Sequence, residues 1–373
     1  MDKNLNICFF ISSMHGGGAQ RVLSILANEF SKRDYRVDLI LAQKKGPYLK
    51  DISNRVNIVD LRTSSIIKSI LPLVGYFRKD KPDILTSALH HANIAAIIAK
   101  IISRTPVKLL IRQDSYYKLP ANLKQALPEK TLYKKADYII AVSEGVADSL
   151  INTLKIPKEK IKVIYNPIFD KSITEKAKQK VFHPFFQDKR YQIILGVGRL
   201  ARVKDFPTLI KAFHSIKTDS MRLMILGEGR ERKELENLVQ ELGLEEYVSM
   251  PGFVENPYAY LAKASVFVLS SKCEGLPNVL IEAMACGTTV VSTDCPGGPY
   301  EILEGGKYGK LVPVGDIAKL AEAISDSLKT PTEKELLISR AKYFSVERAI
   351  NEYEKLFKEL IKRDNSNNRC QNV

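Results

Sequence analysis

The sequence VFVLSSKCEGLPNVLIEAMACGTTVVSTDCPGGPYEIL, residues 266–303, decides the fold of this chain. Its first apolar run, Val266–Leu269, is typical of a buried strand, and residues 270–275 form the loop that leaves this strand. A helix is predicted to begin at Pro277, because proline lacks the amide hydrogen that would stay unpaired in a first helical turn. Another strand is predicted over residues 289–292. The order strand, loop, helix, strand indicates a doubly wound parallel sheet.

Two glutamates lie close to the start of this helix. Glu274 precedes the helix N-terminus in the loop, and Glu282 is expected about two turns into the helix. The unpaired amide hydrogens and the positive end of the helix dipole suit an anionic ligand at this place, most simply a phosphate. Favourable charges in the first turns of an ordinary helix would also explain the two glutamates.

The spacing of these glutamates resembles the signature of the retaining glycosyltransferases of family 4. In that signature seven residues separate two glutamates, as they separate Glu274 from Glu282 here. The matching residues between and after the glutamates are Gly275, Pro277, Ala283 and Gly287. The resemblance implies the GT-B architecture, an α/β fold in which two Rossmann-like, doubly wound domains face each other across a cleft.

The chain length of 373 residues fits two domains of ordinary size. We expect an N-terminal, acceptor-side Rossmann-like domain over residues 1–165 and a C-terminal, nucleotide-sugar-binding Rossmann-like domain over residues 191–345. Residues 166–190 are polar and without strong periodicity, so they are predicted to link the two domains. Residues 346–373 are predicted to form a terminal helix that crosses back to the N-terminal domain and ends in a polar tail.

Short apolar segments alternate with helical patterns along the chain, which indicates parallel sheets wrapped by helices. Strands of the first domain are predicted over residues 6–11, 36–42, 56–60, 83–87, 107–111, 138–142 and 162–165. In the second domain a strand is predicted from residue 191, another run at residues 221–226 continues the unit, and closing helices are predicted over residues 316–328, 333–343 and 346–362.

A glycine-rich loop over residues 12–18 lies between the first strand and an amphipathic helix. Such a loop would also suit a dinucleotide-binding dehydrogenase, so it is a weak signal by itself. Two features argue against a dehydrogenase: the GxGxxG spacing is absent, and Asp34 and Asp38 are poorly placed to bind a ribose. The family resemblance implies instead that Gly17 and Gly18 approach the phosphates and the sugar of a donor.

Two further segments of the C-terminal domain match the family pattern. Arg199 and Lys204 follow a strand end in the run GVGRLARVK, and the resemblance implies that they hold the donor diphosphate. A guanidinium fork and a mobile ammonium can neutralise two phosphates and then the leaving nucleoside diphosphate. The turn MPGFV is implied to lie near the base, where backbone groups of Gly252, Phe253 and Val254 could recognise uracil.

The resemblance also assigns roles to the central stretch. Glu282 would bind the ribose hydroxyls, Glu274 would bind and position the transferred sugar, and Gly275, Leu276 and Pro277 would belong to the same substrate-binding loop. No metal or other cofactor is implied, because an Asp-x-Asp site is lacking and the two cations could take the charge. No carboxylate suits a covalent intermediate, so we expect a same-face substitution in which the leaving phosphate accepts the proton of the acceptor.

His90 and His91 follow the strand predicted over residues 83–87, at its carboxyl end, where ligand-binding loops gather. One of the two is expected to face the cleft, and His91 is the candidate catalytic residue beside Glu274. An ordinary surface or core histidine would explain either position equally well.

The formal net charge of +15 is concentrated in the N-terminal half of the chain. Residues 1–165 carry 27 lysines and arginines against 14 aspartates and glutamates, a net charge of +13, whereas residues 166–373 carry 30 against 28. Nucleic acid, an anionic membrane surface or an acidic acceptor could each attract such a domain. No nucleic-acid-binding motif accompanies the charge, so an anionic membrane surface is favoured and nucleic acid is not expected as a partner.

The apolar and basic segment 66–81, IIKSILPLVGYFRKDK, has two interpretations. It is either an ordinary core-facing helix, which Pro72 would interrupt or kink, or a patch that enters the membrane interface. No apolar run approaches the roughly 20 residues that span a bilayer, the N-terminus lacks a signal cleavage site, and the five cysteines lack paired or metal-ligand spacing. We therefore expect a cytoplasmic protein that is peripheral on the inner face of the cell membrane.

These features together predict a retaining hexosyltransferase. It is expected to transfer a hexose or an N-acetylhexosamine from a UDP-sugar to a polyprenyl diphosphate-linked saccharide, for surface polysaccharide or glycan synthesis. The run SSKCEGLPNVLIEAMACG is similar to bacterial enzymes that extend such lipid-linked glycans. Two alternatives stay open: a nucleotide-sugar epimerase of the same fold, which a reaction without acceptor would reveal, and a basic nucleic-acid-binding protein, which a filter-binding titration across salt would reveal.

Overall fold

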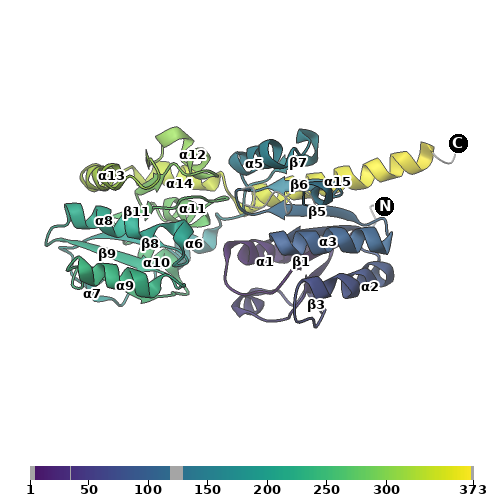
Figure 1. The fold of residues 1–373 in the computed structure, drawn as a ribbon, viewed down its shortest axis with the longest axis horizontal. Helices are drawn as coiled ribbons and strands as arrows, with labels where there is room; N and C mark the ends of the chain where they lie inside the picture. The colour runs from purple at the N-terminus through teal and green to yellow at the C-terminus, as the bar shows by residue number, and fades with distance from the viewer. Residues whose placement is uncertain (1–4, 34, 118–128, 371–373) are drawn as a thin grey trace. The chain divides into compact units, whose positions relative to one another are not determined.

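The computed structural model describes residues 5–33, 35–117 and 129–370 of the chain. Its contacts divide the chain into two compact units. The first unit comprises Met1–Pro167 and Val346–Val373, and the second comprises Ile168–Ser345. Each unit contains a parallel sheet of its own, with helices on both of its faces (Figure 1).

The first unit is built on a seven-stranded parallel sheet with the strand order β3-β2-β1-β4-β5-β6-β7. Its strands are β1 (Asn6–Ile11), β2 (Arg36–Leu41), β3 (Asn57–Asp60), β4 (Ile84–Ala88), β5 (Lys108–Gln113), β6 (Tyr138–Ala141) and β7 (Ile161–Val163). The order reverses between β1 and β4, which are paired neighbours with Ile7 opposite Ile84. In a doubly wound sheet such a reversal opens a crevice at the carboxyl ends of the two strands.

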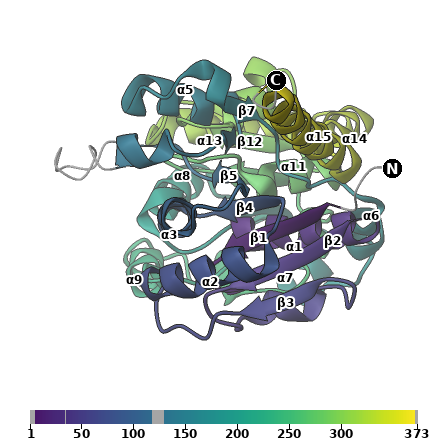
Figure 2. The same ribbon diagram turned by 90° about the vertical axis from the view of Figure 1, so that its right-hand side faces the viewer.

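Helices cover both faces of this sheet. The helices of the unit whose full bounds are described are α1 (Gly18–Ser31), α2 (Ile70–Asp80), α3 (His90–Ser103), α5 (Glu144–Leu154) and α15 (Val346–Cys370). Helices α1 and α15 pack on the face that presents Ile7, Phe9 and Ile11 of β1. On the opposite face, the thiol of Cys8 lies 3.1 Å from the Tyr76 hydroxyl of α2, and α3 packs on β4 and β5 (Figure 2). Alternate residues of one buried strand therefore contact different helices.

The segment 66–81 forms a short 3-10 turn, Ile67–Ser69, followed by α2. Pro72 does not interrupt or kink a longer helix, because α2 begins at Ile70 and places the proline in its first turn. Leu73, Val74 and Phe77 are buried against the sheet. The inner side of α2 thus faces the core, as the interpretation of segment 66–81 as an ordinary core-facing helix predicted.

The second unit contains a six-stranded parallel sheet with the order β10-β9-β8-β11-β12-β13. Its strands are β8 (Gln192–Val197), β9 (Met221–Leu226), β10 (Val248–Gly252), β11 (Val266–Leu269), β12 (Val290–Thr293) and β13 (Lys310–Val312). The strand predicted over Val266–Leu269 is confirmed as β11, and the order reverses beside it, between β8 and β11. Both sheets therefore have the doubly wound topology that the sequence predicted.

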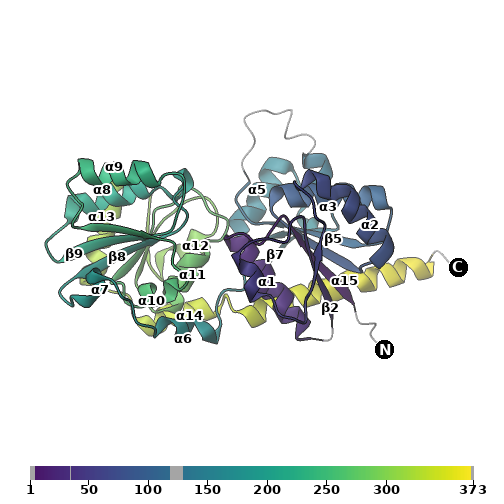
Figure 3. The same ribbon diagram turned by 90° about the horizontal axis from the view of Figure 1, so that it is seen from below.

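The helices of the second unit form a layer on each face of its sheet (Figure 3). They are α6 (Lys171–Ala177), α7 (Pro184–Gln187), α8 (Phe206–Ile216), α9 (Arg232–Glu241), α10 (Pro257–Leu261), α11 (Asn278–Ala285), α12 (Pro299–Ile302), α13 (Ile317–Lys329) and α14 (Lys334–Lys342). Helices α8, α9 and α13 share one apolar core with β8, β9 and β11. Helices α10 and α11 cover the other face, which leaves the loops at the strand ends to build a site.

The structure differs from the predicted linker over residues 166–190. The N-terminal segment of the first unit ends at Pro167, and the segment after it forms α6 and α7 within the second unit. The Asn256 amide donates to the carbonyl of Lys176 at 2.8 Å, and the His183 ring lies 3.1 Å from the Ser249 hydroxyl. The polar residues that indicated a linker instead make hydrogen bonds that hold this segment in place.

The terminal helix α15 belongs to the first unit. Its Phe357 ring packs at 5.2 Å, centre to centre, from Phe30 of α1, and Arg33 forms an ion pair with its Glu354. The helix continues through the predicted polar tail to Cys370, and residues 371–373 lie outside the described residues. No helix within residues 5–33, 35–117 and 129–370 has both the length and the apolar composition that crossing a membrane requires.

Candidate functional site

Two predicted site residues meet where the strand order of the second unit reverses. Lys204 lies in the loop after β8, at the end of the 3-10 turn Arg202–Lys204, and Glu274 lies in the loop after β11. The Lys204 ammonium is 2.6 Å from Glu274 Oε1, and the two side chains are only 19% and 12% exposed. The pair therefore bridges the crevice at the carboxyl ends of β8 and β11, where doubly wound sheets bind ligands.

Hydrogen bonds and an ion pair within and between the two loops fix this pair. The hydroxyl of Ser271 donates to Glu274 Oε1 at 2.6 Å, and the hydroxyl of Ser270 donates to the carbonyl of Lys204 at 2.8 Å. The Lys272 ammonium reaches Asp205 at 3.1 Å. Neither serine was predicted as a site residue, because a serine after a strand has no pattern that separates it from an ordinary loop residue.

The loop DCPGGP packs directly against Glu274. The amide of Glu274 donates to the carbonyl of Pro296 at 3.0 Å. Gly297 has a φ of +123°, and a Cβ at this position would lie 2.1 Å from the carbonyl oxygen of Glu274. Only glycine allows this approach, so the loop after β12 sets the position of the carboxylate that follows β11.

The start of α11 is buried together with its acidic residue. Gly275, Leu276 and Pro277 are buried, and Pro277 lies just before the first residue of the helix. Glu282 is 4% exposed and is the fifth residue of α11, so it lies just over one turn into the helix and not two turns. Glu282 lies only four positions after the first residue of α11, Asn278, and one helical turn takes about 3.6 residues.

Three neighbouring loops of the second unit are joined by backbone hydrogen bonds at the same sheet edge. The amide of Gly198 donates to Leu226 at 2.9 Å, and the amide of Gly227 donates to Gly252 at 2.8 Å. These bonds place the predicted base-binding turn at the edge that carries the predicted phosphate-binding loop. Arg199 and Phe253 are exposed there, and Val254 is half-buried.

Two buried thiols that follow β12 or end α11 are unsuited to nucleophilic chemistry. Burial raises the pKa of the Cys295 thiol to about 12, and the Glu274 carboxylate adds to the shift. Burial likewise raises the pKa of Cys286 to about 12, with a contribution from Glu282. Because the thiolate is the reactive form, both cysteines stay inert near neutral pH. The part of the chain that the structure describes contains no group of three or more His, Cys, Asp or Glu suited to hold a metal ion.

The remaining predicted residues lie in the first unit, at its own strand-order reversal. Gly17 and Gly18 start α1 after β1, and His91 lies in the first turn of α3 after β4. The His91 side chain is exposed. The His90 ring is held more tightly, because its two nitrogens lie 3.2 Å from the Tyr133 hydroxyl and 3.1 Å from Glu129. Neither of these two partners of His90 was predicted from the sequence.

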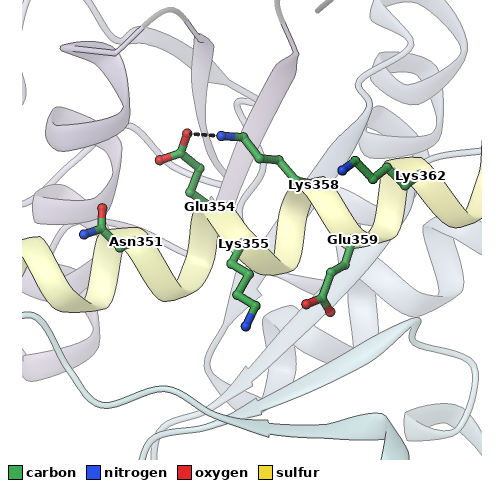
Figure 4. Close-up of a pocket in the computed structure, with 6 residues that line it drawn as sticks. All are labelled: Asn351, Glu354, Lys355, Lys358, Glu359 and Lys362. Atoms are coloured by element: carbon green, nitrogen blue, oxygen red, sulfur yellow. Dashed lines mark ion pairs between the residues drawn. The ribbon is translucent and has the colours of Figure 1, made fainter.

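A hollow of about 410 Å³ lies elsewhere in the first unit, along one side of α15. Its lining residues are Asn351, Glu354, Lys355, Lys358, Glu359 and Lys362. Figure 4 shows that all six project from a single helix and that Glu354 is paired with Lys358. The hollow lacks converging groups from several elements, so it is not the candidate site.

Family comparisons match both halves of the chain. A model described as glycosyl transferases group 1 matches residues 177–344, and a model described as Glycosyltransferase Family 4 matches residues 16–170. The first range contains Lys204, Glu274 and Glu282, and the second contains Gly17 and His91.

Two curated relatives from Campylobacter jejuni align over nearly the whole chain. One is an N-acetylgalactosamine-N,N'-diacetylbacillosaminyl-diphospho-undecaprenol 4-alpha-N-acetylgalactosaminyltransferase, 32% identical over 349 residues, which are 89% of this chain and 93% of that protein. The other is a GalNAc-alpha-(1->4)-GalNAc-alpha-(1->3)-diNAcBac-PP-undecaprenol alpha-1,4-N-acetyl-D-galactosaminyltransferase, 28% identical over 352 residues, with 91% of this chain and 93% of that protein covered.

Solved structures share the fold. Sucrose-phosphate synthase from Thermosynechococcus elongatus superposes with a TM-score of 0.82 at 20% identity, covering 96% of this chain and 100% of that chain. The Anabaena protein HepE, in a complex with UDP-glucose, gives a TM-score of 0.79 at 22% identity, covering 95% of this chain and 100% of that chain. The predicted GT-B class, with two Rossmann-like doubly wound domains, is thereby confirmed.

Proposed function

Because this chain belongs to the family 4 glycosyltransferases, we propose that it transfers a hexose or an N-acetylhexosamine from a UDP-sugar to a polyprenyl diphosphate-linked saccharide. The product would serve surface polysaccharide or glycan synthesis. The observation that carries the proposal is the contact between Lys204 and Glu274 across the β8–β11 crevice. This contact supports the proposal, because an ammonium suited to a phosphate lies there beside a carboxylate suited to sugar hydroxyls.

The donor diphosphate is proposed to bind Arg199 and Lys204. Without a donor, the ammonium of Lys204 is neutralised by Glu274 at 2.6 Å. A diphosphate entering the crevice would offer the ammonium two negative groups in place of one. Lys204 would then turn to the phosphates, and exposed Arg199 would add a guanidinium fork from the same loop.

The same exchange would release Glu274 to bind the transferred sugar. Its carboxylate would keep the Ser271 hydroxyl as a hydrogen-bond donor, which orients it toward the crevice. Glu282 is proposed to bind the ribose hydroxyls. Gly275, Leu276 and Pro277, which lead into α11, would supply backbone groups and close packing to the donor.

The remaining predicted residues are proposed to contact the base of the donor, or its phosphates and sugar from the first unit. Backbone groups of Gly252, Phe253 and Val254 are proposed to recognise uracil, since this turn is bonded to the loop after β9 at the same sheet edge. Gly17 and Gly18 of the first unit are proposed to approach the phosphates and the sugar, where the absence of side chains would let the backbone come close.

Retention of configuration is proposed to follow from a same-face substitution. A hydroxyl oxygen of the acceptor forms a bond to the anomeric carbon while the bond from that carbon to the diphosphate oxygen breaks. The acceptor proton passes to the leaving diphosphate, and UDP departs. Glu274 and His91 are the proposed catalytic residues that contact the sugar, and the charge of the leaving group would be stabilised by Arg199 and Lys204.

The acceptor is proposed to be a lipid-linked saccharide at an anionic membrane surface on the inner face of the cell membrane. The names of both Campylobacter relatives describe acceptors on diphospho-undecaprenol, which supports this acceptor class for a chain 32% identical to one of them. The net charge of +13 over residues 1–165 would attract both an acceptor diphosphate and anionic lipids.

A transfer assay with labelled donors tests the proposal. The protein is incubated with a panel of radiolabelled UDP-sugars and a membrane lipid extract, and the label that enters the lipid phase is counted. We expect label from one UDP-hexose or UDP-N-acetylhexosamine to enter the lipid phase only when both protein and lipid are present. Conversion of the donor to another UDP-sugar without lipid would identify an epimerase and overturn the proposal.

A further inference from the structure

The exposed large aliphatic side chains of the first unit gather on two neighbouring elements. Within the described part of this unit they are Ile67 and Leu71 of the α2 region, 74% and 71% exposed, and Ile101 and Ile102 of α3, 49% and 42% exposed. Exposed apolar side chains scattered singly need no explanation, but a cluster on one face indicates a binding surface.

The two pairs belong to one continuous face. Helices α2 and α3 pack side by side, and the Arg78 guanidinium of α2 donates to the carbonyl of Ile102 at 3.1 Å, which joins their C-terminal ends (Figure 2). Half-buried Ile94 and Ile98 precede Ile101 and Ile102 at helical spacing on the same side of α3. Isoleucines therefore extend along α3 beside the α2 positions.

Basic side chains border this face. Lys68 and Lys79 are exposed and lie three and eight positions from Leu71, on its side of the helix. Lys81 and Arg104, also exposed, lie at the C-terminal ends of α2 and α3. Asp80 is the acidic residue of α2, and it lies 3.9 Å from Arg36, which offsets its charge.

We propose that this surface is where the enzyme docks on an anionic lipid bilayer. We call it the α2–α3 face, and we define it as Ile67, Leu71, Ile94, Ile98, Ile101 and Ile102 with the bordering Lys68 and Lys79. Its isoleucines and leucine enter the headgroup boundary, and its lysines bind lipid phosphates. The inference rests on the proposed function, since it names the place where an enzyme acting on a lipid-linked acceptor meets the membrane.

The residues proposed here to contact the bilayer differ from those of the membrane patch that was predicted over the segment 66–81. Leu73, Val74 and Phe77 are in the core and cannot enter a bilayer. Arg78 already donates to carbonyls at the end of α3. The α3 helix, outside that segment, contributes half of the strongly exposed side chains. Charge complementarity favours an anionic bilayer as the binding partner of this face, because the face has an apolar centre and a basic border.

Sedimentation with vesicles tests the α2–α3 face. The whole protein is mixed with vesicles of phosphatidylcholine, with or without anionic phosphatidylglycerol, at low and high salt. We expect the wild type to pellet with the anionic vesicles at low salt and much less in the other conditions. The double variants Ile67→Asp with Leu71→Asp, Ile101→Asp with Ile102→Asp, and Lys68→Glu with Lys79→Glu should each bind about tenfold more weakly.

Matched variants outside the α2–α3 face control for charge and for surface polarity. Val314→Asp, in the second unit, and Lys355→Glu with Lys362→Glu, on α15, change similar exposed side chains and should bind as the wild type does. Wild-type binding by the face variants would overturn the proposal, and so would equal losses in the controls. A wild-type dimer that the face variants abolish, without vesicle binding, would assign the face to a second copy of the chain instead.

A soluble-acceptor assay separates failure of this inference from failure of the proposed function. With a short-chain, water-soluble acceptor diphosphate, all the face variants should transfer sugar at the wild-type rate, because the α2–α3 face contains no residue of the donor site. If they do so while vesicle binding is unchanged, the docking face is refuted and the transferase stands. If the wild type transfers no sugar to any acceptor, the proposed function fails whatever the vesicles show.

Discussion

The ammonium of Lys204 and the carboxylate of Glu274 neutralise each other in the second unit. We predict that Lys204→Ala lowers turnover by tenfold to a hundredfold or more, because a contact to a charged group contributes about 1.5 to 3 kcal/mol and strengthens in the transition state. Steady-state transfer rates measure the effect. Lys211→Ala, an exposed lysine of α8, is the matched control and should keep the wild-type rate. Wild-type turnover of Lys204→Ala would remove the residue from the site.

A second residue-scale prediction concerns Arg112, which is fully buried at the end of β5. Its guanidinium donates to Asp114 at 2.6 Å, to Asn166 at 2.9 Å and to the Tyr353 hydroxyl of α15 at 2.7 Å. Arg112→Met leaves the Asp114 carboxylate without its cation, so we expect the free energy of unfolding to fall by about 3 to 5 kcal/mol.

Urea denaturation followed by circular dichroism measures the loss at Arg112. Tyr353→Phe, which removes one hydrogen bond to a charged group, should lose about 1.5 to 3 kcal/mol. Arg55→Met, at an exposed arginine of the same unit, should stay within about 0.5 kcal/mol of the wild type. Equal stability of Arg112→Met and Arg55→Met would show that the buried network contributes nothing.

Some residues of the candidate site can be predicted from the sequence, but most of their side-chain partners cannot. Glu274 and Lys204 were predicted because each occurs in a recognisable run, and the structure brings them into contact. Ser271 lies in the same loop as Glu274, 3 residues before it, but a serine after a strand has no distinguishing pattern. Arg112 occurs in no recognisable run, and its partner Tyr353 lies 241 residues away in the chain. Long-range partners of this kind depend on the folded sheet order, which local patterns do not contain.

Between elements, the close approach of the β12 loop to the β11 loop leads to a prediction about glycine. Gly297→Ala would place a methyl group 2.1 Å from the Glu274 carbonyl oxygen, so the loop and its carboxylate must shift. We expect kcat/KM to fall by about tenfold or more, because small displacements of a positioning group are costly.

Gly306→Ala is the matched control for this element. Gly306 also has a positive φ, of +103°, but a Cβ there would meet nothing within 4 Å. The two variants carry a similar backbone strain, so a difference in kcat/KM reports the steric contact with Glu274. Equal kcat/KM values for the two alanine variants would show that the DCPGGP loop does not position the carboxylate.

Comparison of the predicted and observed strand boundaries shows which strands can be located from local sequence patterns alone. β1, β9 and β11 end where the sequence predicts, because buried parallel strands are unbroken apolar runs between polar loops. The strand β13 (Lys310–Val312) was not predicted, since three residues with one exposed side chain carry too little pattern. The predicted linker was polar because its residues bond to the second unit, and polarity alone does not separate such a segment from a flexible one.

For the whole molecule, the account predicts a transferase that works without a divalent metal ion. In the proposed mechanism, Arg199 and Lys204 supply the positive charge that a metal would otherwise bring to the leaving diphosphate. Excess chelator should therefore leave the initial transfer rate nearly unchanged. A collapse of the rate with chelator, restored by magnesium or manganese, would contradict the roles given to these two cations.

The two units have different proposed roles, donor binding for the second unit and membrane binding for the first. The second unit carries most of the residues proposed to bind the donor, and the first unit carries the excess positive charge and the α2–α3 face. The sequence predicted both the pair of Rossmann-like domains and the uneven charge, because composition and strand alternation are properties of long segments. It did not predict that two separate helices form one apolar face, since that depends on how the helices pack.

Proton NMR of the complete reaction tests the central claim most directly, because it follows the donor, the new linkage and its configuration at once. The wild type is given an α-configured UDP-sugar and a short-chain lipid-linked acceptor. The account predicts that the donor anomeric signal falls while an α-anomeric signal of the extended acceptor rises, and that neither changes without acceptor. A β-linked product, or a second UDP-sugar formed without acceptor, would contradict it.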